Sequence, residues 1–121
     1  MSDHYCADAV VIGAGVIGAA VALELTRGGR KTISVDRLPA AGYGSTSSSC
    51  AIIRVHYSTL EGTAFAYDGY FDWKHWKAFL DCPVDIETAR FQESGCLVMK
   101  TKGNGHLEKI VANVEKLSIP Y

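Results

Sequence analysis

The first 36 residues contain two short β-rich runs separated by a longer run of small aliphatic residues. Residues 7–12 form an apolar run that stops at a glycine, which is typical of a strand buried on both faces. Residues 16–27 are rich in alanine and leucine and precede Gly28 and Gly29, which predicts a helix ended by glycine. Residues 31–36 contain alternating β-branched residues and predict a second strand. This order predicts a right-handed βαβ unit in a parallel sheet.

The pattern after residue 36 is less regular. Residues 38–50 combine glycine, proline and many hydroxyl side chains, so we predict no regular element there. Residues 52–57 predict a short extended segment, and residues 61–80 predict a helix whose aromatic face belongs to the core. Residues 91–100, with a central glycine, predict a bulged strand or hairpin. Residues 105–117 predict an amphipathic helix.

Composition and charge limit the kinds of molecule that the chain is expected to bind. The chain has 121 residues, 48% of them hydrophobic, and 12 basic side chains oppose 13 acidic ones. A net charge of -1 gives no field that attracts polyanions, so nucleic acids and anionic membrane surfaces are poor candidate partners. We expect one globular domain, or part of one, that binds a small molecule.

Neither a cysteine framework nor a leader sequence is predicted. Cys6, Cys50, Cys82 and Cys96 lie far apart, so we expect reduced, mostly buried thiols and no disulfide or metal site. The apolar run over residues 9–25 lacks a basic leader and contains several glycines and an acidic residue. This pattern argues against a signal peptide or membrane span, and we expect a cytoplasmic protein.

A complete GxGxxG motif lies between the first predicted strand and the predicted helix. Gly13 would permit the tight turn, Gly15 the close approach of a diphosphate, and Gly18 the packing of helix against strand. The free N–H groups at the helix start, near Val16 and Ile17, would face the diphosphate. The motif therefore predicts a dinucleotide site, with a pure packing role as the alternative.

Asp36 ends the second predicted strand and lies 23 residues after Gly13, the first glycine of the motif. An acid at this place accepts hydrogen bonds from ribose hydroxyls and repels a 2′-phosphate. The pair of motif and acid thus favours NAD or the adenosine half of FAD over NADP.

Three segments distinguish between these cofactors, because together they resemble the start of the D-amino-acid oxidase superfamily. They are Asp36-Arg37, residues 44–49 (Gly-Ser-Thr-Ser-Ser-Ser) and residues 52–54 (Ile-Ile-Arg). The sarcosine oxidase, dimethylglycine dehydrogenase and glycine oxidase group is the most similar branch. The resemblance implies that the hydroxyl-rich turn contacts FAD, that one residue lies beside the adenosine, and that one binds the substrate carboxylate. The residues of the turn that would contact FAD are Gly44, Ser45, Thr46 and Ser47. Arg37 would lie beside the adenosine, and Arg54 would bind the substrate carboxylate.

The resemblance also implies an α/β fold, with an incomplete Rossmann-like FAD/NAD(P)-binding domain over residues 1–90. Residues 91–121 would begin an interleaved substrate-domain segment with a strand and a helix. Because members of the superfamily are much longer, we expect an amino-terminal fragment that is inactive alone and associates with itself or with the rest of an enzyme.

The implied reaction is oxidation of the C–N bond of an amino acid or N-methyl amino acid. Hydride would leave the α-carbon for the flavin, and water would hydrolyse the resulting imine. Residues 47–49 contain no histidine, the residue that attaches flavin covalently in some members, so we expect noncovalent FAD. No catalytic residue is assigned. The alternatives are an NAD-dependent dehydrogenase and a noncatalytic nucleotide-binding or dimerising module.

Overall fold

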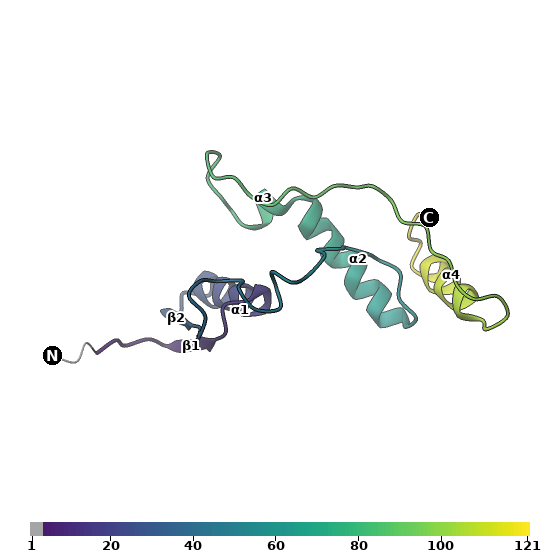
Figure 1. Cartoon of the computed structure of the whole chain (residues 1–121). Helices are drawn as coiled ribbons and strands as arrows, with labels where there is room; N and C mark the ends of the chain where they lie inside the picture. The colour runs from purple at the N-terminus through teal and green to yellow at the C-terminus, as the bar shows by residue number, and fades with distance from the viewer. Residues whose placement is uncertain (1–3) are drawn as a thin grey trace. The chain divides into compact units, whose positions relative to one another are not determined.

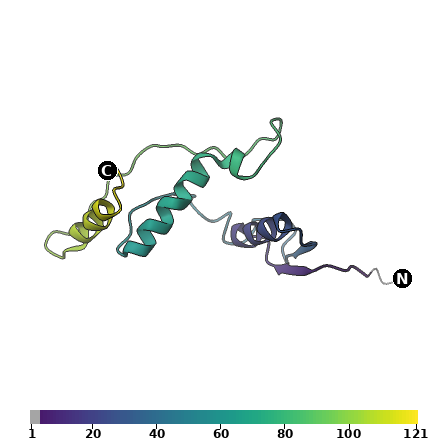
Figure 2. The same cartoon turned by 180° about the vertical axis from the view of Figure 1, so that it is seen from behind.

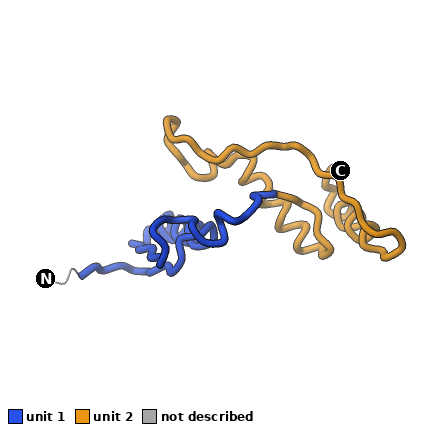
Figure 3. The backbone as a smooth tube through the Cα atoms, viewed as in Figure 1, with its two compact units in different colours: residues 1–52 blue, residues 53–121 orange. Residues whose placement is uncertain are grey.

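The computed structural model describes residues 4–121 and divides into two compact units, coloured separately in Figure 3. The first unit ends at Ile52, and the second extends from Ile53 to Tyr121. In the described part of the chain, no helix combines the length and apolarity needed to cross a membrane.

The first unit is a βαβ unit, labelled in Figure 1. Strand β1 (Ala9–Ile12) leads into helix α1 (Val16–Arg27), which is followed by strand β2 (Thr32–Val35). The two strands pair in parallel, with Ala9 opposite Thr32 and Ile12 opposite Val35. The predicted order, the parallel pairing and the exact bounds of the helix are confirmed, while each strand is shorter than predicted.

One face of this small sheet is covered by α1. Val11 lies against the helix, whereas its neighbours Val10 and Ile12 are 59% and 87% exposed. Successive side chains of a strand point to opposite faces, so these two residues belong to the face away from α1. Within the described residues, that face of the sheet is open to solvent.

The second unit is built around three helices, seen from opposite sides in Figures 1 and 2. They are α2 (Leu60–Lys74), the single turn α3 (Trp76–Phe79) and α4 (His106–Lys116). The Thr59 hydroxyl caps α2 by accepting a hydrogen bond from the Gly62 N–H at 3.2 Å. The single helix predicted over residues 61–80 is instead two helices, α2 and α3, because the backbone leaves the helical conformation at His75, where ψ is 33°.

The hydrophobic core of the described chain lies in this second unit. Ile110 and Val114 of α4 are buried together with Ile119, and partly buried side chains pack around them. Those surrounding residues are Val55, Tyr67, Val98 and Leu117. The apolar face predicted for residues 105–117 is confirmed, because it supplies most of this core.

The aromatic face of the second unit is less buried than predicted. Its rings contact one another in two groups, one around Tyr70 and one around Trp76, and in the second group the stacked pair Trp73 and Trp76 has ring centroids 4.4 Å apart. Phe65 nevertheless remains 83% exposed, and no aromatic side chain among residues 4–121 is fully buried. The interpretation of these residues as core is therefore only partly right.

Two further expectations are corrected by the structure. Residues 91–100 form no strand, because no segment within the described residues pairs with their backbone in a ladder. The cysteines are not mostly buried either: Cys6, Cys50 and Cys96 are exposed, and Cys82 is half-buried. All four are free thiols in the structure.

Candidate functional site

The glycine turn joins the carboxyl ends of the two strands. Gly13 has a φ of +105°, a backbone conformation that residues other than glycine rarely adopt. Its N–H donates to the Val35 carbonyl at 2.8 Å, which holds the turn beside the end of β2. The conformational role predicted for Gly13 is confirmed.

Gly18 allows α1 to lie directly on this turn. A Cβ atom at position 18 would lie 1.8 Å from the Gly13 carbonyl oxygen and 3.4 Å from Cγ1 of Val11. Since no side chain fits at the shorter distance, the helix and the strand approach each other only because this residue is glycine. The packing role predicted for Gly18 is also confirmed.

Asp36 contacts the turn through its carboxylate. Oδ2 accepts a hydrogen bond from the Ala14 N–H at 2.7 Å, and Oδ1 accepts one from the Leu38 N–H at 2.8 Å. These two bonds, the one from Ala14 first, lower the pKa of Asp36 below its ordinary value of 3.8, and the charge of Arg37 contributes less. The acid is therefore ionised at neutral pH and lies beside the start of α1.

The hydroxyl-rich loop, residues 41–49, is bonded to the same turn at two places. The Gly42 N–H donates to the Ala14 carbonyl at 2.8 Å, and the Val16 N–H donates to Oγ1 of Thr46 at 2.9 Å. Helix α1 has no cap from its own N-cap residue Gly15, so Thr46 satisfies one of its free N–H groups. The loop thus brings a hydroxyl group to the positive end of the helix.

The missing side chain of Gly15 leaves the space that this hydroxyl uses. A Cβ atom at position 15 would lie 3.0 Å from Oγ1 of Thr46. In this structure, the close approach that the second glycine of the motif permits is made by Thr46. A diphosphate at the start of α1 would therefore lie beside this hydroxyl and the backbone N–H groups of the first helical turn.

The remaining predicted residues are arranged less uniformly. The Ser47 hydroxyl donates to the Gly44 carbonyl at 3.1 Å, so it helps to shape the loop. Ser45 and Arg37 are exposed, and no side-chain hydrogen bond among the described residues joins either of them to the glycine turn. Ile17 lies at the start of α1 with 79% of its surface exposed. The structure brings together Gly13, Gly15, Val16, Gly18, Asp36 and Thr46, but not Ser45 or Arg37.

Ala14 is a central residue that sequence reasoning did not single out. Its N–H binds Asp36 and its carbonyl accepts from Gly42, so one peptide unit on each side of this residue joins the acid and the loop. Its methyl group plays no part in these bonds, which explains why residue type gave no signal. Only its place between two glycines of the motif could have indicated it.

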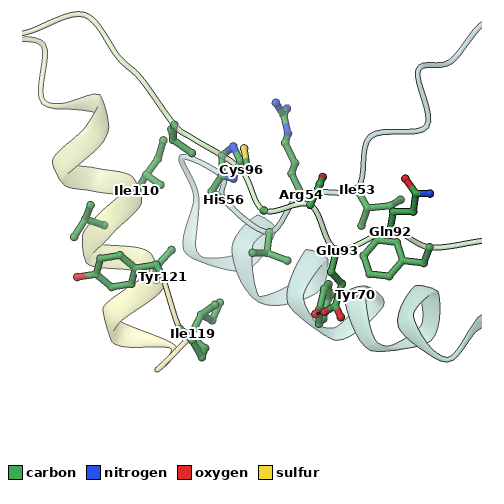
Figure 4. Close-up of a pocket in the computed structure, with 18 of the residues that line it drawn as sticks. Ile53, Arg54, His56, Tyr70, Gln92, Glu93, Cys96, Ile110, Ile119 and Tyr121 are labelled. Atoms are coloured by element: carbon green, nitrogen blue, oxygen red, sulfur yellow. Dashed lines mark hydrogen bonds between the residues drawn. The ribbon is translucent and has the colours of Figure 1, made fainter.

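The predicted carboxylate-binding residue belongs to the second unit. Arg54 is exposed and lines a cavity of about 690 Å³, shown in Figure 4. The cavity is bounded by residues 53–56, Tyr70 of α2, residues 91–96 with Val98, α4 and the last three residues of the chain. Its walls are mostly apolar, and Arg54 and Glu93 supply opposite charges at its lining.

These two charges do not neutralise each other. Glu93 accepts hydrogen bonds from the Tyr70 hydroxyl and from Nζ of Lys74, the latter at 3.0 Å. In Figure 4, the Arg54 side chain extends away from Tyr70 and Glu93. Among residues 4–121, Arg54 forms no ion pair with any acid. Its guanidinium lies instead over the ring of Tyr57, with Cζ 5.0 Å from the ring centroid.

His56 follows Arg54 by two residues, lines the same cavity and is half-buried. Burial lowers the pKa of His56, and the positive charges of Arg54 and Lys100 lower it further. At neutral pH this imidazole is therefore uncharged, and Arg54 supplies the positive charge at this part of the lining.

Comparison with known proteins gives one family. The family model described as FAD dependent oxidoreductase matches residues 8–120, which include both the glycine turn and Arg54. Neither the curated proteins nor the solved structures contain a match.

Proposed function

The chain belongs to the FAD-dependent oxidoreductase family, and we propose that it binds FAD noncovalently for oxidation of the C–N bond of an amino acid or N-methyl amino acid. The observation on which the proposal depends is the bonded group of turn, acid and loop in the first unit. Asp36, Ala14, Gly42, Val16 and Thr46 form it through three hydrogen bonds of 2.7 to 2.9 Å. We infer that this arrangement is suited to an adenosine diphosphate group.

The residues present fit each part of that group. Asp36 keeps unused lone pairs on both carboxylate oxygens, because each accepts one backbone hydrogen bond, so it can also accept from ribose hydroxyls. The first turn of α1 offers N–H groups and partial positive charge to the diphosphate. Bound FAD would supply the two-electron oxidation by accepting hydride from the α-carbon of the substrate.

Thr46 is the hydroxyl residue that we place at the diphosphate. Its oxygen accepts from Val16, and within the described residues no acceptor takes its own proton. A hydroxyl that accepts from a helix N-terminus is polarised and becomes a better donor. We propose that this proton is donated to a phosphate oxygen, while Ser45, Ser47 and Gly44 shape the rest of the loop.

Arg54 is the residue that we place at the substrate carboxylate. A guanidinium presents five N–H donors that match the geometry of a carboxylate, and Arg54 is not consumed by any acidic side chain of the described chain. The neutral state of the neighbouring His56 leaves the arginine as the anion-binding group. We therefore propose an amino acid, with its carboxylate at Arg54, as the substrate class.

Calorimetric titration of the chain with FAD, FMN, NAD⁺ and NADP⁺ tests the cofactor. We expect FAD to bind, FMN to fail because it lacks the adenosine half, and NADP⁺ to bind less well than NAD⁺ because Asp36 repels its 2′-phosphate. Thr46→Val should weaken FAD binding about tenfold, as expected for a lost hydrogen bond to a charged group. Ser48→Ala, an exposed change in the same loop, is the matched control.

The outcomes separate the alternatives. Stronger binding of NAD⁺ than of FAD would overturn the proposal in favour of a nicotinamide-dependent dehydrogenase. Equal FAD affinities of Thr46→Val and the unaltered chain would overturn the assignment of Thr46. No binding of any of the four nucleotides would overturn the cofactor site itself.

A further inference from the structure

Tyr57 lies three residues after Arg54 and presents its ring to the guanidinium. Cζ of Arg54 is 5.0 Å from the ring centroid, within the range of an attractive cation–π contact. Tyr57 is 37% exposed and Arg54 is exposed as well, so this contact lies at the surface and Arg54 remains accessible to a ligand from solvent. Tyr57 can position the arginine only if the tyrosine is itself held in place.

The backbone of Tyr57 is fixed from two helices. Its N–H donates to Oγ1 of Thr63 at 3.3 Å, and its carbonyl accepts from the same hydroxyl at 3.2 Å. The carbonyl also accepts from Nδ2 of Asn113 in α4 at 3.2 Å. Thr63, in the first turn of α2, is 0% exposed, and the single proton of its hydroxyl is shared between the Tyr57 carbonyl and the Thr59 carbonyl, the latter at 2.9 Å. A buried hydroxyl and an amide therefore hold both polar groups of the Tyr57 backbone.

This arrangement differs from that of an ordinary surface arginine. A long charged side chain normally samples many rotamers, and ordering it costs free energy when a ligand binds. A guanidinium whose face lies on an aromatic ring keeps the N–H groups in its plane free for a carboxylate. The described residues provide no acid that competes for those groups.

We propose that Tyr57 is a positioning residue that orders Arg54 for binding of a carboxylate. The inference rests on the carboxylate role given to Arg54 above. It makes no use of the tyrosine hydroxyl, so it predicts that any aromatic ring at position 57 serves equally well. Thr63 and Asn113 contribute by fixing the backbone that places the ring.

Nuclear magnetic resonance of the whole chain tests the proposal with two variants. Tyr57→Phe keeps the ring and Tyr57→Leu removes it, and neither touches the backbone hydrogen bonds to Thr63 and Asn113. The Arg54 side-chain signals, assigned by their loss in Arg54→Lys, should show a ring-current shift in the unaltered chain and in Tyr57→Phe. In Tyr57→Leu this shift should disappear, while the amide spectrum of α2 and α4 stays unchanged.

Titration with N-methylglycine then measures the consequence for binding, with ethanolamine as the probe that lacks a carboxylate. We expect N-methylglycine to shift the Arg54 signals, and its affinity to fall about two- to fivefold in Tyr57→Leu, with no change in Tyr57→Phe. Equal affinity in all three proteins, or a loss in Tyr57→Phe as large as in Tyr57→Leu, would overturn the positioning role.

The same data distinguish failure of the function from failure of this inference. If N-methylglycine moves no Arg54 signal in the unaltered chain, the carboxylate role of Arg54 is wrong, and the positioning role falls with it. If binding occurs at Arg54 but the ring-current shift is absent, only the role of Tyr57 is wrong.

Discussion

At the scale of single residues, Asp36 does more than its place in the sequence indicated. The spacing from Gly13 predicted an acid close to the glycine turn, and the 2.7 Å bond to Ala14 confirms that proximity. The second bond, to Leu38, depends on how the chain turns after β2, which no residue pattern specifies. The acid therefore joins the turn, the strand end and the start of the loop.

This double bonding predicts an acid-sensitive contribution to stability. The pKa of Asp36 is lowered in the folded chain, because the backbone bonds favour the charged form. Its contribution is therefore fully present above the ordinary pKa of 3.8 and is lost as pH falls through the lower folded value. Asp36→Asn should remove this part of the pH dependence and lower stability at pH 7, measured by urea unfolding followed by circular dichroism.

A matched change is Asp85→Asn, at an exposed aspartate that accepts no backbone hydrogen bond within the described residues. It should leave the loss of stability at acid pH as it is in the unaltered chain. If Asp36→Asn and Asp85→Asn have the same acid profile, the two backbone bonds do not contribute to folding.

At the scale of elements, local pattern was most informative where glycine and apolar residues coincide. The bounds of α1 were predicted exactly, because a glycine motif precedes it and a glycine pair follows it. The break at His75 was not predicted, since aromatic residues continue at helical spacing across it. Residues 91–100 have strand-like composition, yet a strand requires a partner, and partners are not encoded in the segment itself.

The packing of α1 on β1 should be highly sensitive to one methyl group. Gly18→Ala places a carbon 1.8 Å from the Gly13 carbonyl oxygen, so the helix must move away from the strand. We expect a loss of about 1 to 3 kcal/mol in the stability of the first unit, the usual range for overpacking. Hydrogen exchange of the α1 and β1 amides measures this loss directly.

Gly69→Ala is the control for helix propensity. Gly69 lies within α2, and a Cβ atom there would meet no heavy atom within 4 Å. Alanine should therefore stabilise that helix by about 0.5 to 1 kcal/mol. A Gly18→Ala chain as stable as the unaltered one would contradict the close packing of helix and strand.

At the scale of the whole molecule, apolar surface is abundant and the core is small. The buried hydrophobic residues of the described chain are Ile110, Val114 and Ile119, all in the second unit. The two-stranded sheet of the first unit has a solvent-exposed apolar face and unpaired edges, a combination that favours contact between chains. The expected self-association is thus a proposal with a definite location on β1.

Light scattering over a range of concentrations tests this proposal. We expect the apparent mass to rise with concentration, and Ile12→Lys to reduce that rise because the charge lies on the exposed face of the sheet. Lys109→Glu, an exposed charge change on α4, should leave it unaltered. A mass equal to one chain at every concentration would contradict the proposal.

The stacked tryptophans determine which optical signal can follow these experiments. Trp73 and Trp76 are the two tryptophans of the sequence, and their rings form one pair at the junction of α2 and α3. Intrinsic fluorescence excited at the indole band therefore originates from a single locus in the second unit. A fluorescence melting curve would register the loss of that pair, but it would not report unfolding of the glycine turn, on which the proposed nucleotide binding depends.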